Sequence, residues 1–266
     1  MIRDQETINA LVDIIERFVR ERLIPAEDQM AEEGKLPDDL LQEMRGLGLF
    51  GLTIPEEYGG LGLTMEEEIL VSMALGHTSP AFRSIMGTNN GIGSAAIVFN
   101  GTEAQKQKYL PKYASGEWIS CFCLTEPEAG SDAASLRTTA RRDGDHYVIN
   151  GTKRYITNAP VAHTFNVMAR TDPEVKGARG ISSFIVERDT PGITLGSIDK
   201  KMGQSGSMTC DVIFEDVRVP AENIIGEEGE GFITAMKVLD RGRLHISGVS
   251  IGVAKRLIAD ALDYAM

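Results

Sequence analysis

The first part of the chain alternates apolar and charged positions at the period of an α-helix. Over Thr7–Leu23, apolar residues recur three or four positions apart with charges between them, which predicts an amphipathic helix that ends at Pro25. Glycine-rich Phe50–Gly62 is expected to be a loop. Further helices are predicted over Asp38–Leu47, Met65–Leu75, Ser79 to about Phe99, and Thr102–Ala114.

Three glycines, Gly87, Gly91 and Gly93, lie inside the fourth predicted helix. Glycine lowers helix stability, so its presence calls for a reason. Close packing of another helix is one alternative, and room for a ligand chain is the other.

From Trp118 the pattern changes to short apolar segments rich in β-branched residues, separated by Gly, Asp and Pro turns. From Gly229 to Met266 the helical period returns, through Phe232, Met236, Leu239 and further apolar residues. The predicted class is therefore α+β. Its parts are an N-terminal helical domain (1–117), a central β domain with antiparallel, barrel-like sheets (118–228) and the first helix of a C-terminal helical bundle (229–266). The expected strands include Val148–Ile149, Phe165–Ala169, Ile181–Val186 and Val212–Phe214.

Composition narrows the functional classes. A net charge of −12 and the lack of a basic cluster with interleaved aromatics argue against a nucleic-acid-binding surface. No apolar run is long enough to span a bilayer, and the charged N-terminus does not look like a signal peptide. The three cysteines suggest a reducing compartment, and Cys121-x-Cys123 lacks the spacing of a zinc site. We therefore expect a cytoplasmic protein without a bound metal, or a matrix protein in a eukaryote.

The segment Cys121–Asp132, CFCLTEPEAGSD, begins as a strand and ends as a turn of small residues. Pro127 fixes its own φ and disfavours helix at the residue before it. Gly130 allows close backbone approach, neighbouring N–H groups can form a concave anion site, and Thr125 and Ser131 add hydroxyl donors. Such a strand end suits a flat ring with a phosphate tail, although an ordinary surface turn would look the same.

A second segment, Gly151–Pro160 (GTKRYITNAP), follows an Asn150-Gly151 hairpin signal. Tyr155, Ile156 and Thr157 place an aromatic, an aliphatic and a hydroxyl side by side. Together they can flank a ring and bond one of its heteroatoms. Packing of Tyr155 within the hairpin is the alternative.

With these motifs the chain resembles the acyl-CoA dehydrogenase family. A weaker match, GLTIPEEYGGLGL (Gly51–Leu63), lies upstream of the strong ones. The strong matches, in family order, are LTEPEAGSD (Leu124–Asp132), NGTKRYITNAP (Asn150–Pro160), KMGQSGSMTCDVIFEDVRVP (Lys201–Pro220) and IIGEEGEGF (Ile224–Phe232). The resemblance implies a flavoprotein oxidoreductase of fatty acid oxidation. Such an enzyme oxidises the Cα–Cβ bond of an acyl-CoA thioester and passes electrons from FAD to electron-transfer flavoprotein.

The resemblance also implies the flavin site. It assigns the ring face and polar edge to the first segment, the phosphate-bearing tail to Gly130 and Ser131, and the other side of the ring to the second segment. Ser131 is also expected to bond the pantetheine arm, and Thr157 to lie near flavin N5. The family usually has tryptophan or phenylalanine where this chain has Tyr155. The implied cofactor-binding residues are Phe122, Leu124, Thr125, Gly130, Ser131, Tyr155, Ile156 and Thr157.

No catalytic base can be assigned. Some members carry a glutamate one residue before an arginine on the long helix, where this chain has Gly242 before Arg243. Most members use a later glutamate, so the base is expected beyond Met266. The resemblance assigns to that later region partner-subunit contacts to the flavin and much of a tetramer interface. We therefore expect a fragment or one piece of a split homo-oligomer, tetramer or dimer, that binds flavin poorly and is weakly active or inactive alone.

The resemblance places Asp240 and Arg243 near the CoA arm and the active-site wall, although locally they look like a solvated ion pair. Thr88 and Arg83 are expected to face the substrate from the glycine-containing helix. Glutaryl-CoA dehydrogenases have an arginine near the position of Arg83 that holds a distal carboxylate; an exposed residue on the first turn is the alternative. Two competing classes are a non-catalytic acyl-CoA-binding module and an acyl-CoA oxidase that uses oxygen.

Overall fold

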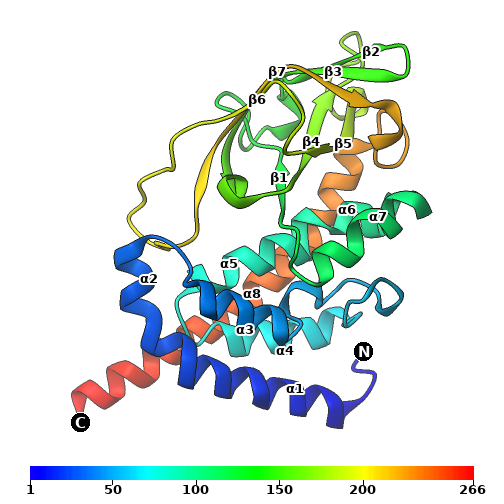
Figure 1. Cartoon of the computed structure of the whole chain (residues 1–266). Coiled ribbons are helices and arrows are strands. Elements are labelled where there is room, and N and C mark those ends of the chain that lie inside the picture. The colour runs from blue at the N-terminus through cyan, green and yellow to red at the C-terminus, as the bar shows by residue number, and fades with distance from the viewer.

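The helices of the N-terminal part form where apolar residues recur at helical spacing. The computed structural model describes residues 1–266 and shows these helices below a curled sheet, with one long helix crossing both (Figure 1). Capping boxes at Thr64 and Thr102 begin two of the helices. The N-terminal helices are α1 (Gln5–Phe18), α2 (Glu27–Glu33), α3 (Asp38–Gly46), α4 (Met65–Leu75), α5 (Pro80–Thr88), α6 (Ala95–Asn100) and α7 (Glu103–Ala114).

The chain stays helical through Pro25, so the prediction that the first helix ends there is wrong. α1 widens into a π-turn over Val19–Leu23 and tightens into a 3₁₀ turn over Ile24–Ala26 before α2 begins. Pro25 lies in the first turn of the 3₁₀ segment, where a missing N–H costs little. A proline therefore marks a change of helix type here, not an end.

The predicted fourth helix is divided into α5 and α6 by a π-turn over Asn89–Gly93. Asn89 is buried in this turn; its amide donates to the Tyr113 carbonyl at 3.0 Å and accepts from the Ser120 N–H at 2.8 Å. A Cβ at Gly93 would lie 3.1 Å from Ser120 Cβ and Oγ at the start of the first strand, so Gly93 serves close packing, although against a strand and not against a helix. A Cβ at Gly91 would meet nothing within 4 Å, so open space lies beside Gly91.

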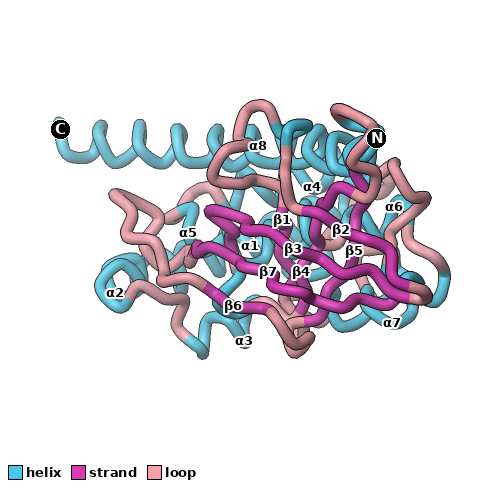
Figure 2. Tube along the Cα trace, turned by 90° about the horizontal axis from the view of Figure 1, so that it is seen from above, coloured by secondary structure: helices cyan, strands magenta, loops and turns pink.

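The central part forms one seven-stranded sheet with the order β1-β4-β2-β3-β7-β6 and with β5 paired to β4. Most neighbours are antiparallel, as predicted, but β1 and β2 each run parallel to β4, so the sheet is mixed. Figure 2 shows the strands side by side with the long helix along one edge. The strands are β1 (Ser120–Cys123), β2 (Thr139–Asp143), β3 (His146–Thr157), β4 (Thr164–Arg170), β5 (Ile181–Glu187), β6 (Ile193–Leu195) and β7 (Thr209–Pro220).

The long helix α8 (Gly231–Ala265) joins the two parts. Its small residues let it cross α4 closely: a Cβ at Gly252 would lie 2.1 Å from the Met73 carbonyl oxygen. Its last turns, with Leu257, Ile258 and Leu262 more than half exposed, extend beyond the rest of the molecule (Figures 1 and 2). No helix of the chain combines the length and the apolar character needed to cross a membrane. The predicted α+β class, with helices, then strands, then a helix, is confirmed.

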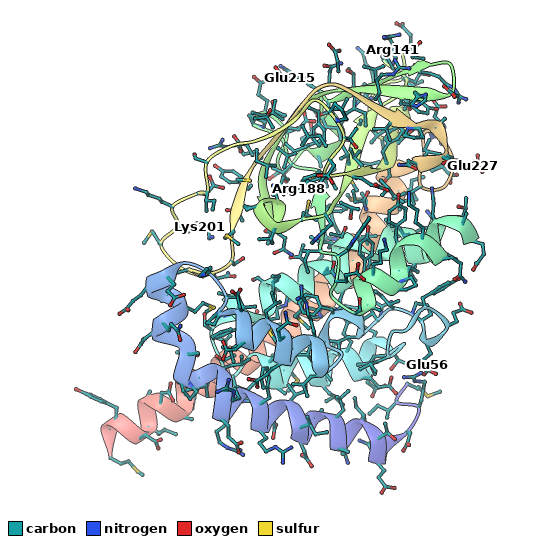
Figure 3. The ribbon with its side chains drawn as sticks, viewed as in Figure 1. Glu56, Arg141, Arg188, Lys201, Glu215 and Glu227 are labelled. Atoms are coloured by element: carbon teal, nitrogen blue, oxygen red, sulfur yellow. The ribbon has the colours of Figure 1, made fainter.

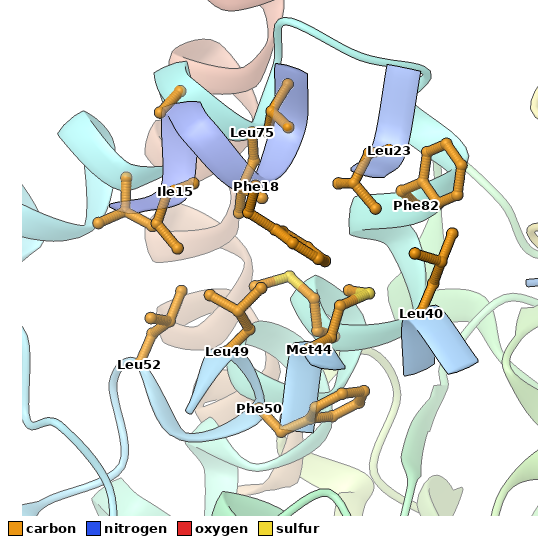
Figure 4. Packing of buried hydrophobic residues seen from close by; sticks show 14 of the residues in the cluster. Ile15, Phe18, Leu23, Leu40, Met44, Leu49, Phe50, Leu52, Leu75 and Phe82 are labelled. Carbon is orange, nitrogen blue, oxygen red and sulfur yellow. The ribbon is translucent and has the colours of Figure 1, made fainter. Parts of the chain in front are cut away.

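Separate apolar cores hold the two layers. The core of the helical layer gathers Phe18 from α1, Leu40 and Met44 from α3, Phe50 from the turn after α3, and Phe82 from α5 (Figure 4). Another cluster fills the sheet, and a third joins sheet and helices beneath α8. Burial of large apolar side chains contributes about 1.5–3 kcal/mol each. These cores fix the position of the strand ends relative to α5 and α8.

Candidate functional site

A cavity of about 490 Å³ opens between the ends of β1 and β3 and the first half of α8. All the residues that the sequence predicts for the flavin line it, although they come from two segments about 30 residues apart. Of the remaining lining residues, Thr88 and Arg243 were expected to contact the substrate, and the others were not assigned to a site. The predicted set is Phe122, Leu124, Thr125, Gly130, Ser131, Tyr155, Ile156 and Thr157, and the others are Thr88, Ile92, Asp132, Ala133, Ala134, Phe232, Met236, Leu239 and Arg243.

A buried ion pair holds the first of these segments in place. The Lys153 ammonium, fully buried, donates to the Glu126 carboxylate at 2.8 Å and to the Leu124 carbonyl at 3.3 Å. The same carboxylate accepts from the backbone N–H groups of Arg137 at 2.6 Å and Thr138 at 3.0 Å. Burial alone would raise the pKa of Glu126, but Lys153 and these N–H donors hold it below its ordinary value. The loop is therefore preorganised without any ligand.

The second segment bulges where it meets the cavity. The pairing of β3 with β7 shifts between Lys153 and Ile156, and Tyr155 adopts a φ of 57°, which is uncommon outside glycine. Its ring is 61% exposed and lines the cavity, with the Arg154 guanidinium 4.8 Å from its centroid. Tyr155 is therefore not a packing residue of the hairpin, and the bulge turns its ring toward the cavity.

Two further contacts tie the cavity walls together. The Arg154 N–H donates to the Thr125 carbonyl at 2.9 Å, which joins the two segments directly. Arg188, labelled in Figure 3, donates from Nη1 to the carbonyls of Ala159, Pro160 and Ala162, just beyond Thr157. Both segments are thus fixed by interactions outside the cavity, so their cavity-facing atoms stay free for a ligand.

The cavity suits a planar ring with a polar edge and an anionic tail. Phe122, Tyr155 and Ile156 supply apolar surfaces, while the hydroxyls of Thr125, Ser131 and Thr157 make no hydrogen bond within the chain. A Cβ at Gly130 would meet nothing within 4 Å, so space is left beside this backbone. These residues fit FAD, with unengaged donors where a flavin presents acceptors.

A second cavity, of about 260 Å³, adjoins the first on the side of α5. It shares Thr88, Ile92, Leu239 and Arg243 with the first cavity, so a ligand can occupy both. None of its lining residues is a carboxylate. The full lining is Arg83, Gly87, Thr88, Gly91, Ile92, Leu239, Gly242, Arg243, His245 and Ile246.

The substrate residues expected from the sequence are only partly brought together. Thr88 and Arg243 line both cavities, and Arg83 lines the second one, half-buried, so it is not an exposed first-turn residue. Asp240 lines neither: its carboxylate is exposed and accepts from Arg243 Nη1 at 2.6 Å, the local ion pair that was the alternative. A Cβ at Gly242 would meet only the Ile92 side chain, at 3.4 Å, so a longer side chain has room there.

A buried charge cluster lies behind the second cavity, and sequence reasoning missed three of its members, Glu68, Arg241 and His245. Glu68, 1% exposed, lies 2.7 Å from His245 Nδ1 and 3.3 Å from the Arg241 guanidinium. Arg83 Nε donates to His245 Nε2 at 2.8 Å. Glu68 is the last of three consecutive glutamates in the first turn of α4 and so gave no signal, and the one signal was a histidine within the apolar pattern of α8.

Comparisons with known proteins agree with this architecture. Residues 5–117 match the family model "Acyl-CoA dehydrogenase, N-terminal domain", and residues 121–217 match "Acyl-CoA dehydrogenase, middle domain". An acyl-CoA dehydrogenase of Bacillus subtilis (strain 168) is 40% identical over 252 residues, which cover 95% of this chain and 66% of that protein.

Two solved structures are also similar. A glutaryl-coenzyme A dehydrogenase in complex with glutaryl-CoA has a TM-score of 0.93 at 33% identity, covering 99% of this chain and 67% of the other. An acyl-CoA dehydrogenase from Bacillus anthracis complexed with FAD has a TM-score of 0.90 at 38% identity, covering 99% and 44%. The chain thus spans about two thirds of the length of the Bacillus subtilis relative and less than half of the Bacillus anthracis chain.

Proposed function

The chain belongs to the acyl-CoA dehydrogenase family, and from that premise we propose that it forms the flavin and acyl-CoA sites of an FAD-dependent dehydrogenase acting on the Cα–Cβ bond of an acyl thioester. One observation carries this proposal: two segments distant in sequence enclose one cavity with unengaged hydroxyls at its polar edge and apolar side chains on its faces. When bound, FAD supplies a two-electron acceptor for the hydride that leaves Cβ.

The residues of this chain have separate parts in that chemistry. Phe122, Leu124 and Tyr155 exclude water from the ring faces, and the hydroxyls of Thr125 and Thr157 donate to the polar edge. Preorganised donors act most strongly where charge develops. Gly130 and Ser131 hold the phosphate-bearing tail, with Ser131 also within the region proposed for the pantetheine arm.

A carboxylate must remove the Cα proton, and the second cavity offers none. Asp132, the only carboxylate of the first cavity, is exposed and accepts from the Ser135 hydroxyl at 2.5 Å. We therefore propose that the base reaches the thioester from outside these two cavities. Gly242 leaves open space at the position where some family members carry a glutamate.

Flavin binding and bleaching test the proposal. The purified chain is incubated with FAD, the bound flavin is measured by absorbance, and butyryl-CoA or octanoyl-CoA is added without oxygen. We expect a bound flavin whose bleaching is slow in the natural chain and faster in Gly242→Glu, since a glutamate side chain at this position can reach from the second cavity toward the first, past the shared residues Leu239 and Arg243. Gly242→Gln is the matched control, because it fills the same space without a base. A chain whose spectrum shows no bound FAD at saturating flavin would contradict the proposal.

A second candidate is a dehydrogenase for glutaryl-CoA or another dicarboxylyl-CoA. The observation that favours it is Arg83, whose guanidinium lines the second cavity and forms no ion pair with any carboxylate of the chain. A guanidinium binds a carboxylate with two parallel hydrogen bonds. Weaker binding of glutaryl-CoA, but not of butyryl-CoA, by Arg83→Ala would support this candidate; equal losses for both would exclude it.

Two further classes stay open to experiment. A non-catalytic acyl-CoA-binding module would bind FAD and thioester without bleaching even in Gly242→Glu, and an acyl-CoA oxidase would release peroxide on turnover. For a dehydrogenase we propose electron-transfer flavoprotein as the acceptor and a homo-oligomer, a tetramer or dimer, as the assembly. The proposed compartment is the cytoplasm, or the matrix in a eukaryote, in line with bacterial and mitochondrial relatives.

A further inference from the structure

The protonation state of His245 follows from its two hydrogen bonds. Arginine is only a donor, so the contact from Arg83 Nε requires a bare lone pair on His245 Nε2. The proton of the neutral ring is then on Nδ1, where it donates to Glu68 Oε1 at 2.7 Å; Ser72 Oγ lies farther from Nδ1, at 3.1 Å. Burial lowers the pKa of His245 and Glu68 opposes that effect, so the neutral ring is the form at neutral pH.

The contact with His245 leaves most of the Arg83 guanidinium free. Nε is engaged, whereas neither Nη1 nor Nη2 makes a hydrogen bond within the chain. The group rests against Gly87, where an added Cβ would lie 2.6 Å from Arg83 Cζ. Arg83 therefore contacts His245 on one side and the backbone of Gly87 on another. It also lines the second cavity, where its remaining donors are available to a ligand.

The cluster also carries more positive than negative charge. Arg83 on α5 and Arg241 on α8 are both cations, and Glu68 on α4 is the one carboxylate that contacts either the cluster histidine or Arg241. Burial lowers the pKa of Arg83 to about 10, which still leaves it charged at neutral pH. Partial burial of a cation without a carboxylate partner costs desolvation free energy. An anion that enters the second cavity would offset this cost.

We infer that His245, oriented by Glu68, is a positioning residue that fixes Arg83 as a carboxylate-binding end of the second cavity. The inference rests on the proposed function and deepens it. The ligand class is an acyl-CoA whose acyl group ends in a carboxylate, since the first cavity would hold the flavin and the thioester end while the second receives the far end of the chain. The bidentate fork of Arg83 matches a carboxylate better than it matches a methyl group.

Calorimetry with two matched ligands tests the recognition step. Glutaryl-CoA and pentanoyl-CoA carry the same number of acyl carbons and differ in the distal carboxylate. In His245→Ala we expect the affinity for glutaryl-CoA to fall about tenfold or more, because Arg83 loses its orientation, while the affinity for pentanoyl-CoA changes less than about twofold. His245→Gln should restore most of the glutaryl-CoA affinity, since an amide can accept from Arg83 and donate to Glu68. Equal affinities of the natural chain for the two ligands would overturn the inference.

Nitrogen NMR of the histidine rings tests the positioning step without any thioester. The His245 signals, assigned by their loss in His245→Gln, should show a protonated Nδ1 and a bare Nε2 at neutral pH. A protonated Nε2 would overturn the inference whatever the ligands do. If neither thioester binds while the tautomer is as expected, the proposed function fails and the geometry of the cluster stands; if both bind and His245→Ala alters neither, the function stands and the inference fails.

Discussion

The protein buries two clusters of charge, one behind each cavity, and they are built differently. In the sheet, Lys153 and Glu126 form an ion pair. The ammonium also donates to a backbone carbonyl, and the carboxylate also accepts from two backbone N–H groups. Between the helices, Glu68 is the single carboxylate beside two arginines. Arg241 contacts Glu68 directly, whereas Arg83 contacts the neutral ring of His245, which lies between Arg83 and Glu68. In the first cluster, one positive and one negative charge balance within the chain. In the second, the positive charges outnumber the negative one.

The difference separates a structural role from a binding role. A buried ion pair in which each charged atom has at least one hydrogen-bond partner holds a loop in one conformation. A cation that lacks a carboxylate partner at a cavity wall lowers stability and is retained where a ligand completes it. Four predictions test this comparison.

Loss of the ammonium from the first cluster should have the largest effect. Lys153→Met leaves the Glu126 carboxylate buried with only backbone donors, and we expect the free energy of unfolding to fall by about 3–5 kcal/mol. Urea denaturation measures it. Lys176→Met, at an exposed position, should change it by less than about 0.5 kcal/mol. If Lys153→Met were as stable as that control, the loop would be held by something other than this pair.

Removal of the surplus cation should have a smaller effect and the opposite sign. Arg83→Met replaces an uncompensated, half-buried charge by an apolar side chain of similar length, and we expect a change between zero and about 2 kcal/mol of stabilisation. The same denaturation assay, without any thioester, measures it. A loss comparable to that of Lys153→Met would mean that the second cluster is also balanced and that the comparison is wrong.

Acidification should reveal the neutral state of His245. Its pKa lies below the unfolded value of about 6.5 because the ring is buried, so the unfolded chain binds more protons as the pH falls below 6.5, and stability is lost in that range. The loss is about 1.4 kcal/mol for each pKa unit of difference. We expect a shallower decline of melting temperature between pH 7 and 5 in His245→Gln; His163, whose pKa burial also lowers, is present in both proteins and cancels. Parallel curves would show that His245 does not titrate as inferred.

The smallest expected effect comes from filling the space beneath Arg83. Gly87→Ala puts a methyl group where Arg83 Cζ would be 2.6 Å away, and the flexible side chain can move at a cost of less than about 1 kcal/mol. The displaced guanidinium should bind glutaryl-CoA less tightly. Gly46→Ala, at the end of α3, lines neither cavity and has nothing within 4 Å of an added Cβ, so it is the control and should leave that affinity unchanged. Equal affinities in the two variants would show that Gly87 does not set the position of Arg83.

Local sequence signals predicted the features that depend on neighbouring residues. The predicted helix Met65–Leu75 coincides with α4, the cap at Thr102 located α7, and turn chemistry located the strand ends that carry Thr125 and Tyr155. The π-turn at Asn89–Gly93 was not predicted, because its cause is the contact of Asn89 with Tyr113 and Ser120, residues of other elements. Periodicity describes one helix at a time, so a break imposed by packing leaves little trace in it.

The charge cluster escaped prediction for a related reason. Glu68 and His245 are 177 positions apart and meet only because glycines let α8 cross α4 closely. Asp240 shows the converse: a family pattern placed it near the substrate, but its position on α8 directs it to solvent beside Arg243. A long-range contact decides the first case, and one sequence alone does not contain it, whereas in the second case the local i, i+3 pattern had already indicated the ion pair.

One rigid helix, α8, contributes walls to both cavities, with Met236 in the first, Leu239 in both and His245 in the second. A helix rises about 1.5 Å per residue, so roughly 9 Å of axial travel separates Leu239 from His245. The rise of α8 therefore fixes the distance between its contributions to the two cavities. Inserting one residue into α8 would rotate every later side chain about 100° around the helix axis. The length of ligand that the two cavities hold can therefore be changed by substituting side chains, but not by inserting residues.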